Sequence, residues 1–327
     1  MKVRVLDVPG FDEIHELRLS GTVAFLAVAH AARGRAFGGI RIRGYAAERD
    51  ALDDALALSR AMARKVALAG IAAGGAKTVL VEPPAERRAE ALAELGAFIE
   101  SLGGKYQCGP DYGFTADDEV VLRRATSHVA TGDLAAGTAE SVARTMSVVA
   151  GPPGRVVIQG VGAVGRLLAE RLKADGAEVA IADPRAPAEL TGTFRRVPVD
   201  AVYDEPCDVF APCAMGGVLD AGTIARLRAR VVCGAANNPL ASLEDADRLS
   251  ARGIVYVPDV LANAGATIVG ASRALGEADL ISRRMDALVA LTAEIVSRAA
   301  RESRTPHAVA MEIADSRVSA LRAGRDL

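Results

Sequence analysis

The chain has 327 residues, of which 50% are hydrophobic and 24% charged, and its formal net charge at pH 7 is −2. This length favours two domains, and the near-zero charge without a basic block argues against nucleic-acid binding. The longest apolar stretches are interrupted well short of the ~18 residues that span a bilayer, and the N-terminal stretch lacks the apolar core of a signal peptide, so we expect no membrane association.

The cysteines and histidines also exclude several classes of site. The four histidines show no metal-ligand spacing, and the cysteines lie far apart with no CxxC pair. We therefore expect no metal centre and no disulfide framework, but free thiols in a cytoplasmic protein. The cysteines are Cys108, Cys207, Cys213 and Cys233.

The first predicted elements are two strands. The short apolar run from Thr22 to His30 is typical of a buried strand, and the alternation from Ile40 to Arg43 predicts a strand with one polar face. The glycine pair before it, Gly38 and Gly39, lets the backbone come close to another group.

Two lysines follow in apolar surroundings. Glu48 to Ala69 is predicted as a helix, and Lys65 lies on the edge of its apolar stripe, where spacing alone favours an amine extended into water. A glycine-rich turn over residues 74–77 ends in Lys77 and leads into a predicted strand, Thr78 to Val81. Because an unpaired buried ammonium is costly, two such lysines suggest a site that needs positive charge and a proton-exchanging amine.

The next segment completes the predicted first domain. An amphipathic helix from Arg87 to Leu102 is followed by a strand over residues 103–108 that delivers Asp111, a residue type common in turns. A short helix capped by Thr115 comes next, and the polar link over residues 127–137 is the predicted domain boundary.

From Thr138 the pattern changes to helices alternating with short buried strands. A helix over residues 139–150 is followed by a strand, Val156 to Ile158, which leads into a GxGxxG sequence, a helix to about Ala174 and a strand that ends in Asp183. This order is the context that a dinucleotide-binding fingerprint requires. The loop consists of Gly160, Val161, Gly162, Ala163, Val164 and Gly165.

Each glycine of the fingerprint is required for a physical reason. Gly160 makes the tight turn, Gly162 admits backbone N–H groups to the pyrophosphate, and Gly165 lets helix and strand pack closely. The helix N-terminus adds partial positive charge. Asp183 is placed to bind the ribose hydroxyls, which favours NAD, while Arg185 leaves NADP open.

The last predicted elements place asparagines at strand ends. In an open α/β sheet ligands bind outside the carboxyl ends of the strands, so Asn237, Asn238 and Asn263 are candidates to hold a carboxamide or carboxylate, although each is equally a common turn residue. The predicted strands are 209–210, 231–232 and 254–256; the predicted helices are 221–228, 243–252, 271–303 and 307–322.

Taken in order, these motifs resemble the glutamate/leucine/phenylalanine/valine dehydrogenase family, over almost the whole chain from about Val23 to Arg317. Within that family the chain looks most like the branched-chain and aromatic amino acid dehydrogenases. The matching sequences are GGIR at 38–41, MARK at 62–65, GGAK at 74–77, PDYG at 110–113, TA at 138–139, the fingerprint, APCA at 211–214, GAANN at 234–238, VPD at 257–259 and NAG at 263–265.

The resemblance implies an α/β fold of two domains with the active-site cleft between them. Residues 1–136 are expected to form a mixed-sheet domain for substrate binding and oligomerisation, and residues 137–305 a Rossmann-type NAD-binding domain. The C-terminal helix, about 306–327, is expected to pack back on the first domain. The implied reaction is oxidative deamination of an apolar L-amino acid to its 2-oxo acid and ammonia by a cytoplasmic homo-oligomer, a dimer or larger.

The resemblance also implies residue roles. Lys65 looks like the lysine that binds the substrate α-carboxylate, and Lys77 like the catalytic lysine whose lowered pKa lets it act on the attacking water. Asp111 looks like the carboxylate that exchanges protons with the α-amino group, beside the Pro110 carbonyl that accepts from the ammonium. The implied nicotinamide and substrate contacts in the second domain are Thr138, Ala214, Ala235, Asn237 and Asn263.

The implied side-chain pocket is mostly apolar. The glutamate enzymes carry a lysine where this chain has Phe37 and a serine where it has Gly270, so both partners of a second carboxylate are missing. Thr267 adds a hydroxyl where relatives are apolar. The implied substrate-binding set is Phe37, Gly38, Gly39, Met62, Gly109, Thr267 and Gly270.

Two alternatives stay open. The family usually has a third glycine where this chain has Ala76, and a positive φ there would strain alanine by about 1 kcal/mol or more. A catalytically inactive NAD-binding paralogue would follow from such a strain. Thr267 instead allows a specialised amine or imine oxidoreductase of the same fold.

Overall fold

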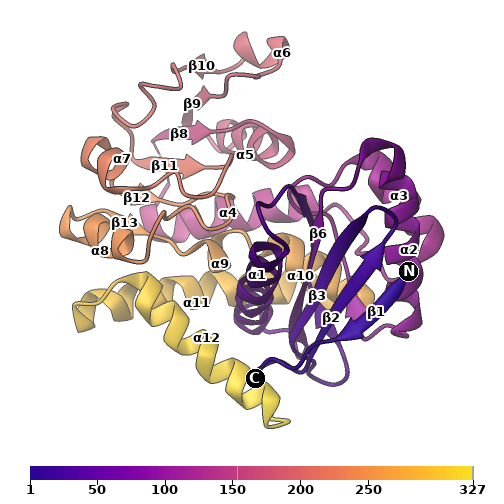
Figure 1. The fold of residues 1–327 in the computed structure, drawn as a ribbon. Helices are drawn as coiled ribbons and strands as arrows, with labels where there is room; N and C mark the ends of the chain where they lie inside the picture. The colour runs from indigo at the N-terminus through magenta and orange to yellow at the C-terminus, as the bar shows by residue number, and fades with distance from the viewer. Residues whose placement is uncertain (153, 326–327) are drawn as a thin grey trace. The chain divides into compact units, whose positions relative to one another are not determined.

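The structure is a computed structural model that describes residues 1–152 and 154–325 and divides into two compact units (Figure 1). The first unit comprises Met1–Gly132, Gly270–Asp279 and the residues from Ala314 onward, and the second comprises Asp133–Val269 and Leu280–Ile313. The first contains a mixed sheet and the second a parallel sheet, so the predicted two-domain α/β fold is confirmed.

Within the described residues, the first-unit sheet has seven strands. Four of them run antiparallel in the order β1-β2-β3-β6, while β4 and β5 run parallel to β6 and β7 runs parallel to β4. The strands are β1 (Lys2–Val5), β2 (Glu13–Leu19), β3 (Thr22–His30), β4 (Ala36–Phe37), β5 (Ile40–Arg43), β6 (Gly74–Val81) and β7 (Tyr106–Gln107).

Helices cover both faces of this sheet. Helix α1 (Glu48–Leu68) packs on the face that carries Phe25 and Val79, whereas α2 (Arg88–Ser101) lies on the opposite face against Leu26 and Leu80 (Figure 1). Alternation along β6 therefore points Lys77, two residues before Val79, towards α1.

The predicted glycine turn over residues 74–77 is wrong, because these residues already belong to β6. The glycines serve close packing instead of a reversal of the chain. A Cβ at Gly74 would lie 1.8 Å from the His30 carbonyl oxygen, and one at Gly75 would lie 2.0 Å from the Ala63 nitrogen on α1. The backbone of β6 thus touches both neighbours just before Lys77.

The other first-unit predictions differ mainly at element ends. Helix α2 follows a short 3₁₀ turn, η1 (Ala85–Arg87), and α3 (Ala116–Ala125) has the predicted cap, since Thr115 Oγ1 accepts from the Asp118 N–H at 3.2 Å. The strand predicted over residues 103–108 is only β7. Strands β1 and β2 were not predicted.

The second-unit sheet, within the described residues, has six parallel strands in the order β10-β9-β8-β11-β12-β13. The order reverses direction between β8 and β11, the position at which open α/β sheets bind ligands. The strands are β8 (Arg155–Gln159), β9 (Glu178–Ala182), β10 (Arg195–Arg196), β11 (Val209–Pro212), β12 (Val231–Val232) and β13 (Val255–Tyr256).

The helices of this half of the chain connect and cover those strands. The single long helix predicted over residues 271–303 is wrong, because Gly276 has a φ of +75° and interrupts it. The helices are α4 (Leu134–Ala150), α5 (Ala163–Ala174), α6 (Ala188–Thr191), α7 (Ala221–Arg226), α8 (Glu244–Ala251), α9 (Asp259–Ala262), α10 (Gly265–Ala274), η2 (Ala278–Leu280), α11 (Ile281–Glu302) and α12 (Pro306–Arg322).

The end of α12 supports α1 within the first unit. Arg317 donates to the carbonyls of Ala67 and Leu68 at 3.2 Å each, and Arg64 pairs with Asp315 at 2.7 Å. These carbonyls close the last turn of α1, where arginine is favourable. Across the described ranges, no helix is both long and apolar enough to cross a bilayer.

Candidate active site

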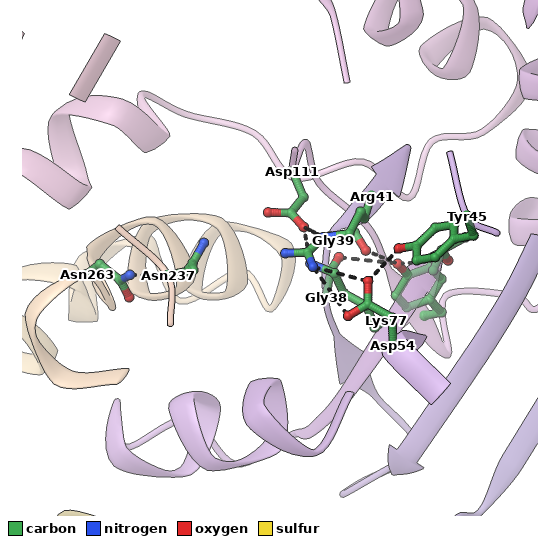
Figure 2. Close-up of polar contacts among 11 residues, drawn as sticks. Gly38, Gly39, Arg41, Tyr45, Asp54, Lys77, Asp111, Asn237 and Asn263 are labelled. Carbon is green, nitrogen blue, oxygen red and sulfur yellow. Dashed lines mark hydrogen bonds and ion pairs between the residues drawn. The ribbon is translucent and has the colours of Figure 1, made fainter. Parts of the chain in front are cut away.

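A buried pair of opposite charges forms the centre of the first-unit site. The Lys77 Nζ lies 2.7 Å from Asp111 Oδ2, and the two side chains are 6% and 13% exposed (Figure 2). Arg41 Nε donates to the same oxygen at 3.2 Å. Since β5 pairs with β6 so that Arg41 faces Val79, Arg41 leaves the sheet on the same side as Lys77.

Burial and neighbouring charges act together on this pair. Burial lowers the pKa of Lys77 below its usual value, and the Asp111 carboxylate only partly opposes that shift. Burial alone would raise the pKa of Asp111, but Lys77 and Arg41 outweigh it and the net shift is downward. The arrangement holds an ionised carboxylate beside an amine that releases its proton more readily than a solvated lysine does.

The Asp111 loop is held along β5. The Ile40 N–H donates to the Gly109 carbonyl at 2.8 Å, and Ile40 forms an isolated parallel bridge with Pro110. A Cβ at Gly39 would lie 3.0 Å from Asp111 Cβ, 3.2 Å from Lys77 Nζ and 3.3 Å from the Pro110 carbonyl oxygen. Gly39 therefore brings the backbone into contact with the charged pair.

The remaining first-unit candidates lie on three elements. Phe37 is buried on β4, Met62 and Lys65 lie on α1, and Gly270 lies in the part of α10 assigned to this unit. Lys65 is 8% exposed, so the interpretation from spacing alone, an amine extended into water, is wrong. Thr267 belongs to the second unit.

Ala76 is not strained. It lies fully buried within β6 opposite Val28, and it is absent from the non-glycine residues with positive φ in the described chain, namely Arg33, Asn238 and Ser303. Alanine therefore costs nothing in backbone conformation here. The observation that motivated a catalytically inactive paralogue is thereby removed.

Restoring glycine at this position should weaken the protein without improving catalysis. We expect Ala76→Gly to lower the free energy of unfolding by about 1–2 kcal/mol, because it removes a buried methyl group and adds backbone freedom in a strand. Urea unfolding and steady-state kinetics of the variant measure both effects. Ala24→Gly, at a fully buried position on β3, is the matched control. A rise in kcat confined to Ala76→Gly would contradict this account.

The three glycines of the second-unit loop serve three different purposes. Gly160 has a φ of +94°, and a Cβ there would lie 2.7 Å from Ala214 Cβ. A Cβ at Gly165 would lie 2.1 Å from the Gly160 carbonyl oxygen, so this glycine permits close packing of helix and strand. Nothing lies within 4 Å of a Cβ at Gly162, which leaves open space at the N-terminus of α5. This cradle fits a pyrophosphate.

The second unit also holds a carboxylate beside that loop. Asp183 follows β9, and its Oδ2 accepts from the Val161 N–H at 2.9 Å while its Oδ1 accepts from the Arg185 N–H at 2.7 Å. The loop residues Ala163 and Val164 begin α5. Asp183 is thus fixed next to the glycine loop by two backbone amides.

A polar cluster lies at the ends of the neighbouring segments. Asn263 Nδ2 donates to Asn237 Oδ1 at 2.9 Å and to the Ala235 carbonyl at 3.1 Å. Asn263 Oδ1 is buried and has no hydrogen-bond partner in the described structure. Thr138 is also buried and donates to the Leu134 carbonyl at 2.9 Å, which leaves its oxygen as an acceptor. Two buried acceptors fit the amide group of a nicotinamide.

Each unit therefore brings its own candidates together. Three residues at the first-unit site were not anticipated in the roles they take: Arg41, Asp54 and Tyr45 form one chain of contacts with Asp111 (Figure 2). The sequence signals for Arg41 were the polar alternation of β5 and the GGIR sequence, and neither shows which partner strand or helix faces the arginine. Among the described residues, no group of three histidine, cysteine or acidic side chains could hold a metal ion.

Comparisons with known proteins match this geometry. Residues 185–318 match the family model for glutamate/leucine/phenylalanine/valine dehydrogenase, and residues 15–131 match the dimerisation domain of the same enzymes. The chain is 38% identical to a valine dehydrogenase of Streptomyces virginiae, over 93% of this chain and 92% of that protein.

The chain belongs to the glutamate/leucine/phenylalanine/valine dehydrogenase family. The prediction made from its motifs is confirmed, and membership makes it an oxidoreductase that acts on amino acids. It is also 34% identical to a leucine dehydrogenase of Thermoactinomyces intermedius, over 94% of this chain and 90% of that protein. The crystal structure of L-tryptophan dehydrogenase from Nostoc punctiforme matches with a TM-score of 0.81 at 29% identity, over 96% of this chain and 97% of that one.

Proposed function

We propose that this dehydrogenase oxidatively deaminates an apolar L-amino acid, branched-chain or aromatic, to its 2-oxo acid and ammonia with NAD as hydride acceptor. The observation that carries the proposal is the buried Lys77–Asp111 pair at 2.7 Å in the first unit. The similarity to valine, leucine and tryptophan dehydrogenases supports the substrate class.

The reaction needs a cation for the substrate carboxylate and two groups that move protons. We assign the buried amine of Lys65 to the α-carboxylate and the Pro110 carbonyl to the α-ammonium. The bound nicotinamide supplies one chemical function, acceptance of a hydride from Cα. Before the hydride leaves, Asp111 takes a proton from the α-ammonium. Water then adds to the resulting iminium carbon while Lys77 takes the proton of the water, and Asp111 returns its proton to the leaving nitrogen. One amino acid, one NAD and one water give the 2-oxo acid, ammonium, NADH and one proton.

The pocket assignment follows from what the first unit lacks. Phe37 and Gly270 offer no partner for a second carboxylate, whereas Phe37 and Met62 supply apolar surface. A Cβ built at Gly109 would have one neighbour within 4 Å, Ala130 Cβ at 3.5 Å. Gly109 therefore leaves space beside the Asp111 loop. These features favour an apolar side chain over glutamate.

We assign NAD in preference to NADP because Asp183 is a fixed carboxylate that would repel a 2′-phosphate. Arg185 and Arg196 lie close to Asp183, since Arg196 donates to the Asp183 carbonyl at 3.1 Å. Activity with NADP is therefore compared with activity with NAD.

A homo-oligomer is supported by the dimerisation-domain match, and a cytoplasmic location by four free cysteines.

A substrate panel tests the proposal. The purified full chain is assayed at 340 nm with NAD or NADP and with valine, leucine, isoleucine, phenylalanine, tryptophan and glutamate, and in reverse with the 2-oxo acids and ammonia. We expect turnover of an apolar amino acid with NAD and at most about 1% of that rate with glutamate. Isobutylamine, which lacks the carboxylate, distinguishes an amine oxidoreductase. Turnover of the amine alone, or of no substrate in either direction, would overturn the proposal.

A further inference from the structure

Beyond the roles assigned above, Asp111 is linked to a second carboxylate through one guanidinium. Arg41 Nε donates to Asp111 Oδ2 at 3.2 Å, and Arg41 Nη1 lies 3.2 Å from Asp54 Oδ2 and 3.4 Å from Asp54 Oδ1. The Tyr45 hydroxyl donates to the same Asp54 oxygen at 2.5 Å. Figure 2 shows these contacts as one continuous chain from Asp111 to Tyr45.

The fold explains why these residues meet. Arg41 and Lys77 lie on the same face of adjacent strands, β5 and β6, and Asp54 comes from α1, which covers that face. The side chains of Arg41 and Asp54 are only 15% and 24% exposed. Charges buried to this extent are only weakly screened by solvent. The positive charges of Lys77 and Arg41 are therefore balanced by two negative ones, Asp111 and Asp54.

We propose that Arg41 and Asp54 are positioning residues that set the protonation state of the Lys77–Asp111 pair during turnover. Arg41 holds the same Asp111 oxygen that Lys77 contacts, and Asp54 holds the guanidinium in place. The inference rests on the proposed function, because it concerns the same pair of proton-transferring groups.

The two residues act on Lys77 with opposite signs. Arg41 lowers the pKa of the Lys77 amine and that of the Asp111 carboxyl, whereas the negative charge of Asp54 raises the pKa of Lys77. Loss of Arg41 should therefore move proton release by Lys77 to higher pH, and loss of the Asp54 charge should move it to lower pH.

The other groups around the pair do not reproduce this pattern. Tyr106 on β7 donates to the carbonyls of Gly38 and Gly39 at 3.3 and 3.4 Å, and burial raises its pKa so that it stays neutral. Tyr45 stays neutral for the same reason, with Asp54 adding to the shift. Among the buried residues of α1 the one charged side chain is Lys65, which is assigned to the substrate carboxylate.

The pH dependence of kcat and kcat/KM tests the proposal in the full-length enzyme. For Arg41→Gln we expect the acidic limb of the profile to move up by about one pH unit, with about a tenfold loss of kcat at pH 7. For Asp54→Asn the limb should move down, and the double variant should lie between the two. Arg41→Lys should recover part of the shift. Arg49→Gln and Asp53→Asn remove a matched but exposed ion pair of α1 and should leave the profile in place.

A second readout needs no substrate. Competitive acetylation of the unliganded protein, with Lys77 and exposed Lys2 quantified by mass spectrometry, gives the pH at which Lys77 is half-reactive. The midpoints should shift with the same signs as the kinetic limbs. A loss of activity in Arg41→Gln with both pH readouts unchanged would overturn the inference and leave a purely structural role. If the wild-type enzyme turned over no amino acid, the proposed function would fail, while the acetylation midpoints would still decide the inference.

Discussion

Replacing Lys77 with methionine is expected to lower kcat for amino acid oxidation by about 10³-fold or more. Loss of a positioned acid–base group typically costs 10²–10⁴-fold in rate. Methionine has a similar length and fills the space of the buried side chain, so the loss should not reflect a cavity. Asp111 keeps Arg41 as a partner, which limits the effect of an uncompensated carboxylate on stability.

Three measurements make this prediction specific. The kcat of the variant is compared with that of the wild type on the best substrate of the panel, NADH binding is followed by fluorescence, and thermal unfolding reports the fold. NADH affinity should be unchanged within about threefold. Lys105→Met removes another lysine–carboxylate pair of the same unit, with Glu13, but a more exposed one, and should retain activity. A Lys77→Met enzyme with more than a tenth of wild-type kcat would contradict the assigned role.

The pH dependence of the wild-type enzyme follows from the same geometry. Because burial lowers the pKa of Lys77, its amine becomes neutral at lower pH than a solvated lysine does. The rate of deamination should therefore rise as the pH increases through that lowered value. The Lys77→Met variant should lack this rise, which separates loss of the amine from loss of packing.

The fold was predicted from the sequence where local pattern decides structure. The run from Thr22 to His30 and the context of the glycine fingerprint depend on short-range periodicity, and both predictions are confirmed. The glycines at 74 and 75 were misread as a turn, because the sequence does not show that β3 and α1 press against that backbone. The break at Gly276 was missed because a single glycine does not reveal its φ.

The candidate site was likewise predicted where local sequence is informative and missed where long-range contacts decide the structure. Lys77 stood out because a lysine in an apolar setting is unusual, whereas Asp111 looked like a turn residue until the family resemblance implied its role; the structure joins them directly. The link through Arg41 to Asp54 depends on strand register and on which face α1 covers. Those are long-range properties, so no local pattern could have predicted them.

Gly38→Ala is expected to destabilise the unliganded protein by about 3 kcal/mol or more, and at the upper end to prevent folding. A Cβ at this position would lie 1.7 Å from the carbonyl oxygen of Ala76 and 2.5 Å from its carbonyl carbon. Both atoms belong to the backbone of β6, immediately before Lys77, so no side-chain rotation relieves the clash. Either the strand separates from the Gly38 segment or the sheet shifts, and overpacking of this severity exceeds the usual 1–3 kcal/mol.

The matched comparison is Gly44→Ala, just after β5 in the same unit. Nothing lies within 4 Å of a Cβ at Gly44 and its φ is not positive, so alanine there should change stability by no more than about 0.5 kcal/mol. Urea unfolding followed by circular dichroism measures both variants, and the soluble yield reports on Gly38→Ala if it does not fold. Equal stability of the two variants would show that the backbone of β6 does not press on Gly38. Lys77 would then lack the fixed support that the proposed proton transfer requires.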